Sequence, residues 1–342
     1  MRLALLFRQD PINRGERAVL VTFGTLVLAA MLYPLWASTY GITVVRDIML
    51  FSIFALSLDY LWGKAGVLTL GHATFFGIGA YAMGILTIKV GASSLAGLFA
   101  GLGMAAALAL VVGTFLIFAG VRLQYFAIVT IALSLVSTQI ALSSSALTGG
   151  DAGLLGVPPF AIELIGARLE LSDHLSQYFV ALSLVTMVYL GLWLACRGNY
   201  GKILAAIRMN EYRARSLGHD TDLHLLIAFV VSAVLAALSG AVFAAVSGFV
   251  APDLVGPLLS TEVVVWVAAG GRGTLLGPVI GAFAVTRLQQ EISSIAAGLW
   301  PLILGILFVL LVFFFPDGVI SVGRQIQAML GGRRTLLRRQ SA

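Results

Sequence analysis

Charged residues are scarce in this sequence. Only 11% of its 342 residues are Asp, Glu, Lys or Arg, whereas soluble domains carry about 25%. Cysteine is scarcer still, because a single Cys196 excludes an internal disulfide and a cysteine-rich metal or redox motif. What is abundant is apolar: 60% of the residues are hydrophobic and the mean hydropathy is +1.02. The composition excludes an ordinary soluble enzyme and predicts an all-α, polytopic membrane protein.

Several uncharged stretches reach the roughly 20 residues that a helix needs to cross the hydrocarbon core. They are residues 18–45, 65–88, 90–121, 123–150, 175–196, 225–252 and 292–316. Residues 257–269 are too short to cross unaided, but an even number of crossings after the basic loop requires them to do so. We therefore expect a helix bundle of about ten transmembrane segments (eight to ten), some of them broken or short.

The basic residues are concentrated at the predicted membrane surfaces. Fourteen of the 21 Lys and Arg lie in residues 2–17, 197–215 and 324–339, whereas residues 143–177 carry four acids and one Arg. The positive-inside rule therefore predicts cytoplasmic tails at 1–17 and 317–342, a cytoplasmic loop at 197–222 and an outside loop at 143–176, around a transmembrane domain at 18–316. This placement favours a lipid bilayer and no nucleic acid as partner.

Residues 63–86 contain six glycines, with Thr69 and His72 among them, and they predict a broken helix. Irregular backbone at membrane depth survives only inside protein or beside a water-filled cavity, so this element is a candidate for lining a solute path. The alternative is that the glycines only pack helices together. The candidate path residues are Asp59, Thr69, His72, Phe75, Phe76 and Tyr81.

Two of those candidates have a simpler interpretation. Asp59 could form an interfacial pair with Lys64, and His72 could be a hydrogen-bonding contact between helices. A short repeat also relates residues 63–71 to 271–277, through Gly-Lys-Ala-Gly and Gly-Arg-Gly, as possible inverted repeats would. In the outside loop, residues 161–171 suggest a short surface helix.

Residues 202–217 predict an amphipathic helix. Ile203, Ile207 and Ala214 fall on one side, and the charged residues Arg208, Glu211 and Arg215 fall on another. Gly218 follows as a suitable C-terminal cap. Such a helix between two spans either lies on the lipid surface or docks into a cytoplasmic partner.

Three stretches together resemble the permease subunits of branched-chain amino acid ABC transporters of the LivM type. They are residues 55–81 with LGHATFFGIGAY, residues 123–159 with YFAIVTIALS and LTGGDAGLLGVPP, and residues 201–278 with AIRMNEYRARSLG, GFVAPDL and GGRGTLLGP. The resemblance implies an importer in the bacterial inner membrane. Its partners would be a second permease protomer of the LivH type in a heterodimer, two cytoplasmic ATPases and a periplasmic solute-binding protein.

On that resemblance, AIRMNEYRARSLG looks like the helix that couples the permease to its ATPase, with Arg208, Asn210, Glu211, Arg215 and Gly218 in contact. The chain has no Walker sequence, because neither Gly-Lys pair has the required spacing or the following Ser or Thr. We therefore expect no enzyme activity and no cofactor or metal in this chain, with ATP and Mg bound by the partner ATPase.

The solute is open at this stage. Many amino-acid members of the family have Asn where Asp59 stands and a Gly-Tyr-Ala-Gly pattern where this chain has Gly63 to Gly66, and the ALSLD and YAMG pieces look like the urea and short-chain amide branch. Branched-chain or hydrophobic amino acids are favoured, with urea or amides as the alternative. An ion-coupled secondary transporter would need a relay of intramembrane acids, but Asp59, Glu262 and Glu291 all lie near predicted helix ends.

Overall fold

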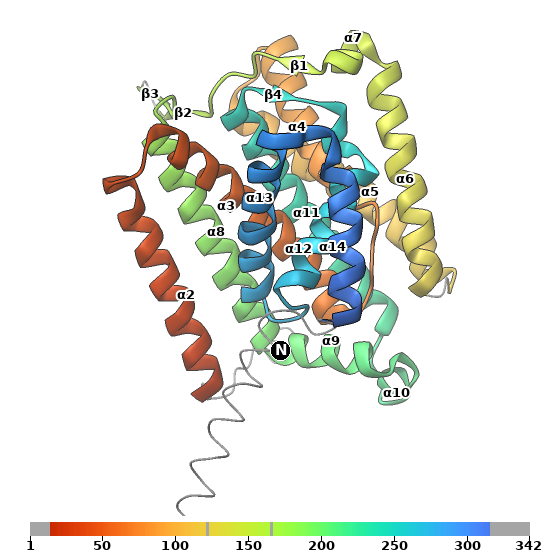
Figure 1. Ribbon diagram of the computed structural model, residues 1–342. Helices are drawn as coiled ribbons and strands as arrows, with labels where there is room; N and C mark the ends of the chain where they lie inside the picture. Colours follow the sequence, from red (N-terminus) through yellow and green to blue (C-terminus); the bar gives the residue numbers. More distant parts are fainter. Residues whose placement is uncertain (1–13, 121–122, 165–166, 315–342) are drawn as a thin grey trace, which may run out of the picture.

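Long apolar helices make up most of the structure, a computed structural model that describes residues 14–120, 123–164 and 167–314 (Figure 1). In those ranges six segments are long and apolar enough to cross a membrane. They contain α2 (Arg14–Leu32), α3 (Thr39–Leu58), α5 (Ser94–Phe118), α6 (Leu123–Ser143), α8 (His174–Arg197) and α11 (Thr221–Ser247). The predicted fold class, a polytopic helical membrane bundle, is confirmed.

Four further helices complete the bundle in the described ranges. They are α4 (His72–Lys89), α12 (Pro257–Gly270), α13 (Leu276–Ala296) and α14 (Trp300–Phe314). With only 14 residues, α12 is the short helix that the sequence predicted at 257–269. Six and four make ten bundle helices in the described ranges, within the predicted eight to ten segments, and six of these ten are long and apolar enough to cross a membrane. The predicted tails at 1–17 and 317–342 lie outside the described residues, apart from the start of α2 at Arg14.

Short elements gather at the two ends of the bundle. The lower end in Figure 1 carries α9 (Asn199–Met209) and α10 (Glu211–Ser216). The opposite end carries α7 (Ser145–Thr148) and four short strands, in which β1 pairs antiparallel with β4 and β2 with β3. The strands are β1 (Leu154–Leu155), β2 (Ala161–Leu164), β3 (Ala167–Glu170) and β4 (Phe249–Val250).

The core lies where α3, α4, α5 and α11 meet, and small residues let their backbones approach. A Cβ atom at Gly79 of α4 would lie only 2.0 Å from the carbonyl oxygen of Ala237 in α11. On α5 the residues that face this core are small and spaced four apart, so they form one stripe along the helix. They are Gly97, Gly101, Ala105, Ala109 and Gly113. Glycine therefore works here as a packing residue.

Residues 63–86 are also broken, as the sequence predicted. α3 continues into a π-helical turn, η2 (Asp59–Ala65), which ends where Gly66 adopts a φ of +88°. Such a conformation is strained for any residue with a Cβ atom. Residues 66–71 then lie outside any helix, and α4 begins at His72. The glycines therefore act in both of the predicted ways: Gly66 ends a helix, whereas Gly79 lets α4 pack against α11. Leu70 N–H is satisfied by the hydroxyl of Thr130 in α6 at 3.1 Å.

A second interruption precedes α12. α11 ends at Gly248 with a φ of +75°, and the chain then passes through β4 and a 3-10 turn, η4 (Pro252–Val255), before α12 starts. The amide of Ala73 at the start of α4 donates to Ser260 Oγ in the first turns of α12 at 3.0 Å. Two helices therefore begin next to each other inside the bundle, each after an irregular segment.

Three expectations from the sequence need correction. Within the helix predicted at 161–171, residues 161–164 and 167–170 instead form the paired strands β2 and β3, and the alternation of Ala, Arg, Leu and Glu in β3 has the period of a strand. The helix predicted at 202–217 is divided at Asn210, whose φ of −163° and ψ of 103° are extended. The two glycine motifs proposed as corresponding repeats lie in contact at the same end of the bundle, since Lys64 Nζ donates to Gly273 O at 2.7 Å. Inverted repeats would place them at opposite ends.

Candidate functional site

The corner formed by α9 and α10 is rigidly built. Asn210 ends α9 and caps α10, because its side-chain oxygen accepts the amide of Arg213 at 3.0 Å. Gly218 ends α10 with a φ of +86°, and His219 N–H closes back on Ala214 O at 3.3 Å, as in a Schellman cap. Of the predicted apolar face, Ile207 and Ala214 are buried. The cap predicted at Gly218 is confirmed.

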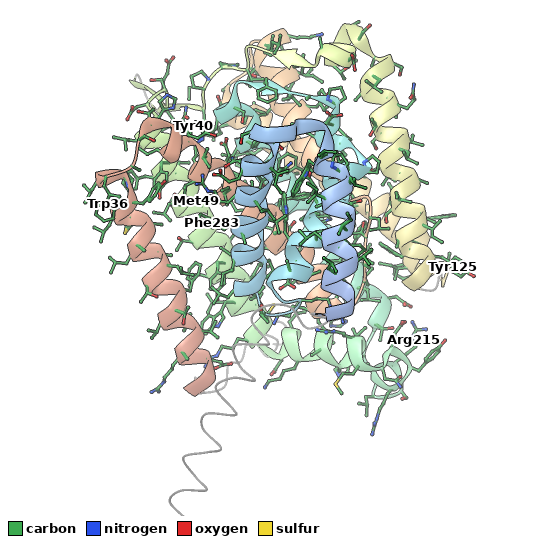
Figure 2. All side chains as sticks on the ribbon, viewed as in Figure 1. Trp36, Tyr40, Met49, Tyr125, Arg215 and Phe283 are labelled. Carbon is green, nitrogen blue, oxygen red and sulfur yellow. The ribbon has the colours of Figure 1, made fainter. Side chains whose placement is uncertain are left out.

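Charged side chains brace this corner against α11. Arg215, labelled in Figure 2, lies at this corner. It donates to Glu211 Oε1 at 3.1 Å within α10, and to Thr221 Oγ1 at 2.9 Å and Asp222 Oδ1 at 2.6 Å in the first turn of α11. Arg208 points inward and donates to the carbonyl of Gly63. The charged residues predicted to contact a partner are therefore, in the isolated chain, bound to their own protein.

The corner exposes large apolar residues among its polar ones. Met209 and Tyr212 are each 87% exposed and Leu217 is 74% exposed, beside exposed polar residues such as Arg213 and Ser216. Met209 and Tyr212 flank the break between α9 and α10, and Leu217 follows α10. Sequence reasoning missed them because it followed the charged face of one continuous helix. Their signal was the presence of large apolar residues beside charged ones in a segment too polar to enter the bilayer.

Asp59 is held by the loop 271–275. It is fully buried at the start of η2, and its carboxylate accepts the amides of Gly273 at 2.5 Å and Leu275 at 3.1 Å. The pairing with Lys64 that the sequence suggested is indirect, because Lys64 binds the carbonyl of the same Gly273. Asp59 therefore lies beside Arg208 and the 271–275 loop.

His72 is at the centre of the bundle. Its Nε2 lies 2.8 Å from Ser57 Oγ on α3, and its ring stacks on Phe54 with centroids 5.3 Å apart. The other ring nitrogen, Nδ1, is buried without a hydrogen-bond partner, as is the hydroxyl of Thr74. One side of the imidazole therefore serves as a contact between helices, and the other has unused hydrogen-bonding capacity.

Aromatic rings surround His72. Phe75 packs edge-on against Phe229 of α11, and Phe76 lies 5.0 Å from Phe54 and 5.7 Å from Phe243 between ring centroids. Thr69 is buried in the segment before α4, where its hydroxyl accepts the amide of Gly71 at 3.3 Å. The structure thus brings Thr69, His72, Phe75 and Phe76 to one region.

Tyr81 lies in a separate hydrophobic cluster. It packs with residues of β1, β4 and the end of α11, such as Leu154, Val250 and Ala244. Its hydroxyl is buried without a hydrogen-bond partner. Tyr81 therefore lies between the centre of the bundle and the end that carries the strands.

Glu262 is a buried acid that the sequence analysis placed near a helix end. It lies within α12, where its Oε1 accepts Trp300 Nε1 of α14 at 2.7 Å and Gln289 Nε2 of α13 at 3.2 Å. It was expected near a helix end, because residues 257–269 offered no clear start for the helix. Its hydrogen bonds give it the role of joining three helices.

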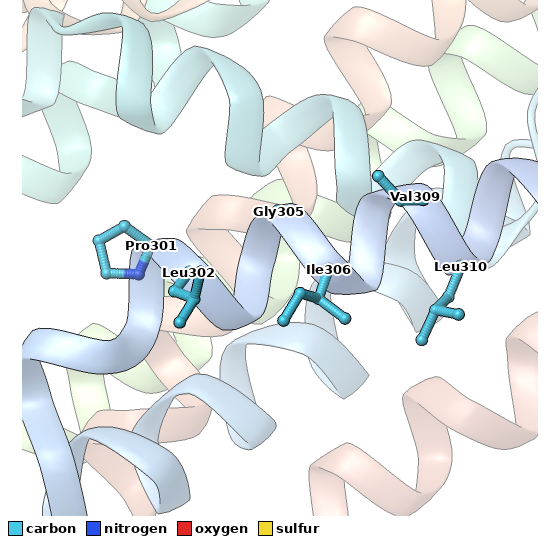
Figure 3. Close-up of a pocket in the computed structure, with 6 residues that line it drawn as sticks. All are labelled: Pro301, Leu302, Gly305, Ile306, Val309 and Leu310. Atoms are coloured by element: carbon cyan, nitrogen blue, oxygen red, sulfur yellow. The ribbon is translucent and has the colours of Figure 1, made fainter.

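Two cavities open elsewhere. One, of about 370 Å³, runs along α14 beside Pro301, Gly305 and Val309 (Figure 3). The other, of about 690 Å³, lies between α2, α3, α8 and α13, with Met49 and Phe283 in its wall (Figure 2). Neither is lined by any of the six candidate path residues. His72, Phe75 and Phe76 are themselves fully buried by neighbouring side chains.

Comparisons with known proteins connect these features to transport. Residues 40–312 match the family described as the permease component of branched-chain amino acid transport systems. The chain is 28% identical over 323 residues to the high-affinity branched-chain amino acid transport system permease protein LivM of Salmonella typhimurium and of Escherichia coli. That match covers 87% of this chain and 74% of each relative.

A shorter match has a different transported molecule in its name. Over 143 residues the chain is 32% identical to the autoinducer 2 import system permease protein LsrC of Photorhabdus luminescens, covering 40% of this chain and 42% of that protein. No solved structure matches the chain.

Proposed function

Because this chain belongs to the family of branched-chain amino acid transport system permease components, we propose that it forms the membrane channel of an ATP-driven importer. The solutes would be branched-chain or other hydrophobic amino acids, delivered by a periplasmic binding protein. A second permease protomer of the LivH type would complete the channel, and two separate ATPase subunits would bind and hydrolyse ATP with Mg.

The single observation that carries the proposal is the exposed apolar surface of the α9–α10 corner. Met209, Tyr212 and Leu217 project from a corner that Asn210 and Arg215 hold rigid. Large apolar and aromatic residues on a polar, rigid element are typical of the centre of a protein interface. This favours docking into a cytoplasmic ATPase. A helix attached to the lipid surface would instead bury its apolar side chains among the lipid headgroups.

The orientation of the chain follows from its charges. Five Lys and Arg between residues 197 and 215 lie at the α9–α10 end, which the positive-inside rule assigns to the cytoplasm of a bacterial cell. Both termini would then be cytoplasmic, and the strands would face the periplasm. The β1–β4 pair and the β2–β3 hairpin would offer the surface that receives the binding protein.

The solute path would pass the adjoining helix starts at the centre. The hydroxyl of Ser260 joins the first turns of α4 and α12, and His72 Nδ1 and Thr74 Oγ1 are polar atoms without partners there. Aliphatic side chains of the solute would contact the rings of Phe75 and Phe76. The Thr74 hydroxyl would donate to its carboxylate oxygen. His72 Nδ1 would accept from its ammonium group, because Ser57 Oγ gives its only proton to Phe54 O and Nε2 must therefore carry the imidazole proton. Since these side chains are packed, the path opens only when helices move.

A labelling experiment tests the docking surface and orientation together. In a Cys196→Ser background, Tyr212→Cys supplies one thiol at the corner, and Leu155→Cys, exposed on β1, supplies one at the other end. A membrane-impermeant maleimide should label Tyr212→Cys only in inside-out vesicles, and addition of the ATPase subunits should protect it. Leu155→Cys should show the reverse sidedness and no protection. Labelling of Tyr212→Cys from the outer surface would refute the proposal.

A further inference from the structure

The contacts of Asp59 form a small, tightly connected cluster at the α9–α10 end. Each carboxylate oxygen accepts a different backbone amide, Oδ1 from Gly273 and Oδ2 from Leu275. Both amides belong to the loop 271–275, which links α12 to α13. One side chain of the first half of the chain therefore fixes the conformation of a loop more than 200 residues later, which includes Leu275 at a φ of +60°.

Two basic side chains complete the cluster, which we call the Asp59 clamp (Asp59, Gly63, Lys64, Arg208 and Gly273). Lys64 Nζ donates to Gly273 O at 2.7 Å, and Arg208 donates to Gly63 O. Lys64 and Arg208 are also close enough to attract the Asp59 carboxylate electrostatically. The backbones are in contact, since a Cβ atom at Gly63 would lie 2.2 Å from Asp59 Oδ1 and 2.5 Å from Gly273 N.

The clamp connects three mechanically distinct elements. Arg208 belongs to α9, the helix that leads to the exposed apolar corner. Asp59 and Gly63 belong to η2, which leads through residues 66–71 to the start of α4 and His72. Gly273 belongs to the loop that joins α12, whose other end meets α4 at Ser260. A displacement of α9 therefore reaches both helix starts at the centre through the clamp.

We propose that Asp59 is a positioning residue that transmits movement of α9 to α4 and α12, by holding the 271–275 loop against η2 beneath Arg208. This role replaces the expectation that Asp59 lines the solute path. It rests on the proposed function, because α9 has a movement to transmit only if an ATPase displaces it.

The Asn that resembling sequences have at this position stands near a Tyr where this chain has Lys64. Beside Lys64 and Arg208, an ionised carboxylate suits this chain better than an amide of the same shape. An ionised Asp only accepts hydrogen bonds, and both of its oxygens face N–H groups. In Asp59→Asn the side chain must place its own NH2 against one of those two amides. One hydrogen bond is then lost, because the NH2 group and a backbone N–H, both donors, face each other. The substitution also removes the negative charge beside Lys64 and Arg208.

The test measures coupling in the assembled complex, with its partner permease, ATPases and binding protein in proteoliposomes. The readout is the number of [14C]leucine molecules imported per ATP hydrolysed, compared among wild type, Asp59→Asn and Ser52→Ala. Ser52 is a matched control because it is buried on α3 and its hydroxyl bonds only to Ile48 O of the same helix. A change that only reduced assembly would lower import and hydrolysis together and leave their ratio unchanged.

We expect Asp59→Asn to lower the ratio about tenfold, the scale of one lost charge-assisted hydrogen bond, while hydrolysis per assembled complex stays within about twofold of wild type. Ser52→Ala should keep the wild-type ratio. Lys64→Met should lower the ratio less, and Asp59→Asn with Lys64→Met should be no worse than Asp59→Asn alone, since both act through Gly273.

The failures of the two proposals can be told apart. If wild type hydrolyses ATP and imports leucine but Asp59→Asn keeps its ratio, the clamp has no part in transmission and this inference is overturned. An Asp59→Asn complex that forms in low yield but retains the wild-type ratio would also overturn it, because the residue would then be structural alone. If the wild-type complex shows no ATP-dependent import of any offered solute, the proposed function itself fails.

Discussion

The α9–α10 corner and the interior around His72 carry the two sets of residues that the sequence singled out, and they are built in opposite ways. At the corner Arg208, Asn210 and Arg215 are hydrogen-bonded within the chain, while large apolar side chains such as Tyr212 are exposed. In the interior the apolar rings are packed, and polar atoms such as His72 Nδ1 and Thr74 Oγ1 lack partners. Under the proposed function, the corner would bind a protein partner, and the interior would bind a polar solute once its packing opens.

The difference teaches where movement is needed. A rigid exposed corner can bind a partner without rearrangement, so little ordering entropy opposes docking. The centre must open before a solute can replace the missing hydrogen bonds. An importer needs this combination, since energy supplied at one end has to change packing at the other, and the Asp59 clamp lies between the two regions.

The largest expected effect on the interior comes from adding one methyl group where the backbones of α4 and α11 touch. In Gly79→Ala the new Cβ would lie 2.0 Å from Ala237 O, so α4 and α11 must separate. We expect a loss of about 3 kcal/mol or more of stability, the upper range of overpacking. The aggregation temperature of the detergent-solubilised protein measures it. Gly103→Ala on α5, with no atom within 4 Å of the new Cβ, should be harmless. Equal stability of the two variants would contradict the packing described.

The corner is tested next by removing its most exposed ring. Tyr212→Ala should weaken binding of the ATPase subunits about thirtyfold, the effect of losing an interface hot spot worth about 2 kcal/mol. Binding of the purified ATPase to the permease in nanodiscs measures this effect. Phe99→Ala is the control, because Phe99 is 68% exposed near the start of α5, the end at which Ser94 bonds to β2. Unchanged ATPase affinity in Tyr212→Ala would show that the surface docks nothing.

His72 distinguishes a ligand-binding interior from one that is merely packed. His72→Ala should lower ATP-driven leucine uptake about tenfold, the cost of one polar contact, while assembly with the ATPases is kept. Ser57→Ala removes the hydrogen bond to Nε2, together with the one that the hydroxyl donates to Phe54 O of its own helix, and should have a smaller effect on uptake. If uptake in His72→Ala is normal, or if Ser57→Ala reduces it equally, His72 is a contact between helices and no part of the path.

The smallest predicted effect concerns the rigidity of the corner. Asn210→Ala removes the cap of α10 and should destabilise that short helix by about 1 kcal/mol. Affinity for the ATPase should then fall about fivefold, because the apolar residues on either side of the break are no longer held in place. Asn210→Asp keeps an acceptor for Arg213 N–H and should bind almost as wild type. An Asp variant as weak as the Ala variant would show that capping is irrelevant to docking.

Much of the fold was accessible from the sequence because the bilayer imposes strong patterns. Uncharged stretches of sufficient length marked the helices, and the six glycines of residues 63–86 marked the break before His72. Parity required a short crossing at 257–269, and α12 is there. Local chemistry was equally informative at Gly218, where a cap was predicted and is found.

The remaining features depend on contacts between residues distant in sequence. Asp59 appeared to be a path residue or a partner of Lys64, because nothing near it in sequence reveals the loop 271–275. The break at Asn210 was missed because the amphipathic pattern continues on both sides of it, so that the segment looked like a single helix. The capping role of Asn210 was not apparent from the sequence. The β2–β3 hairpin was missed since four-residue strands leave a weak periodic signal.

The central claim is that solute crosses through this chain by work done on the α9–α10 corner, and transport in proteoliposomes tests it most directly. The complex of both permeases, the ATPases and the binding protein should accumulate [14C]leucine only when ATP is supplied on the corner side. Accumulation should stop with a non-hydrolysable ATP analogue and be indifferent to proton or sodium gradients. Uptake that follows an ion gradient without ATP would contradict the account.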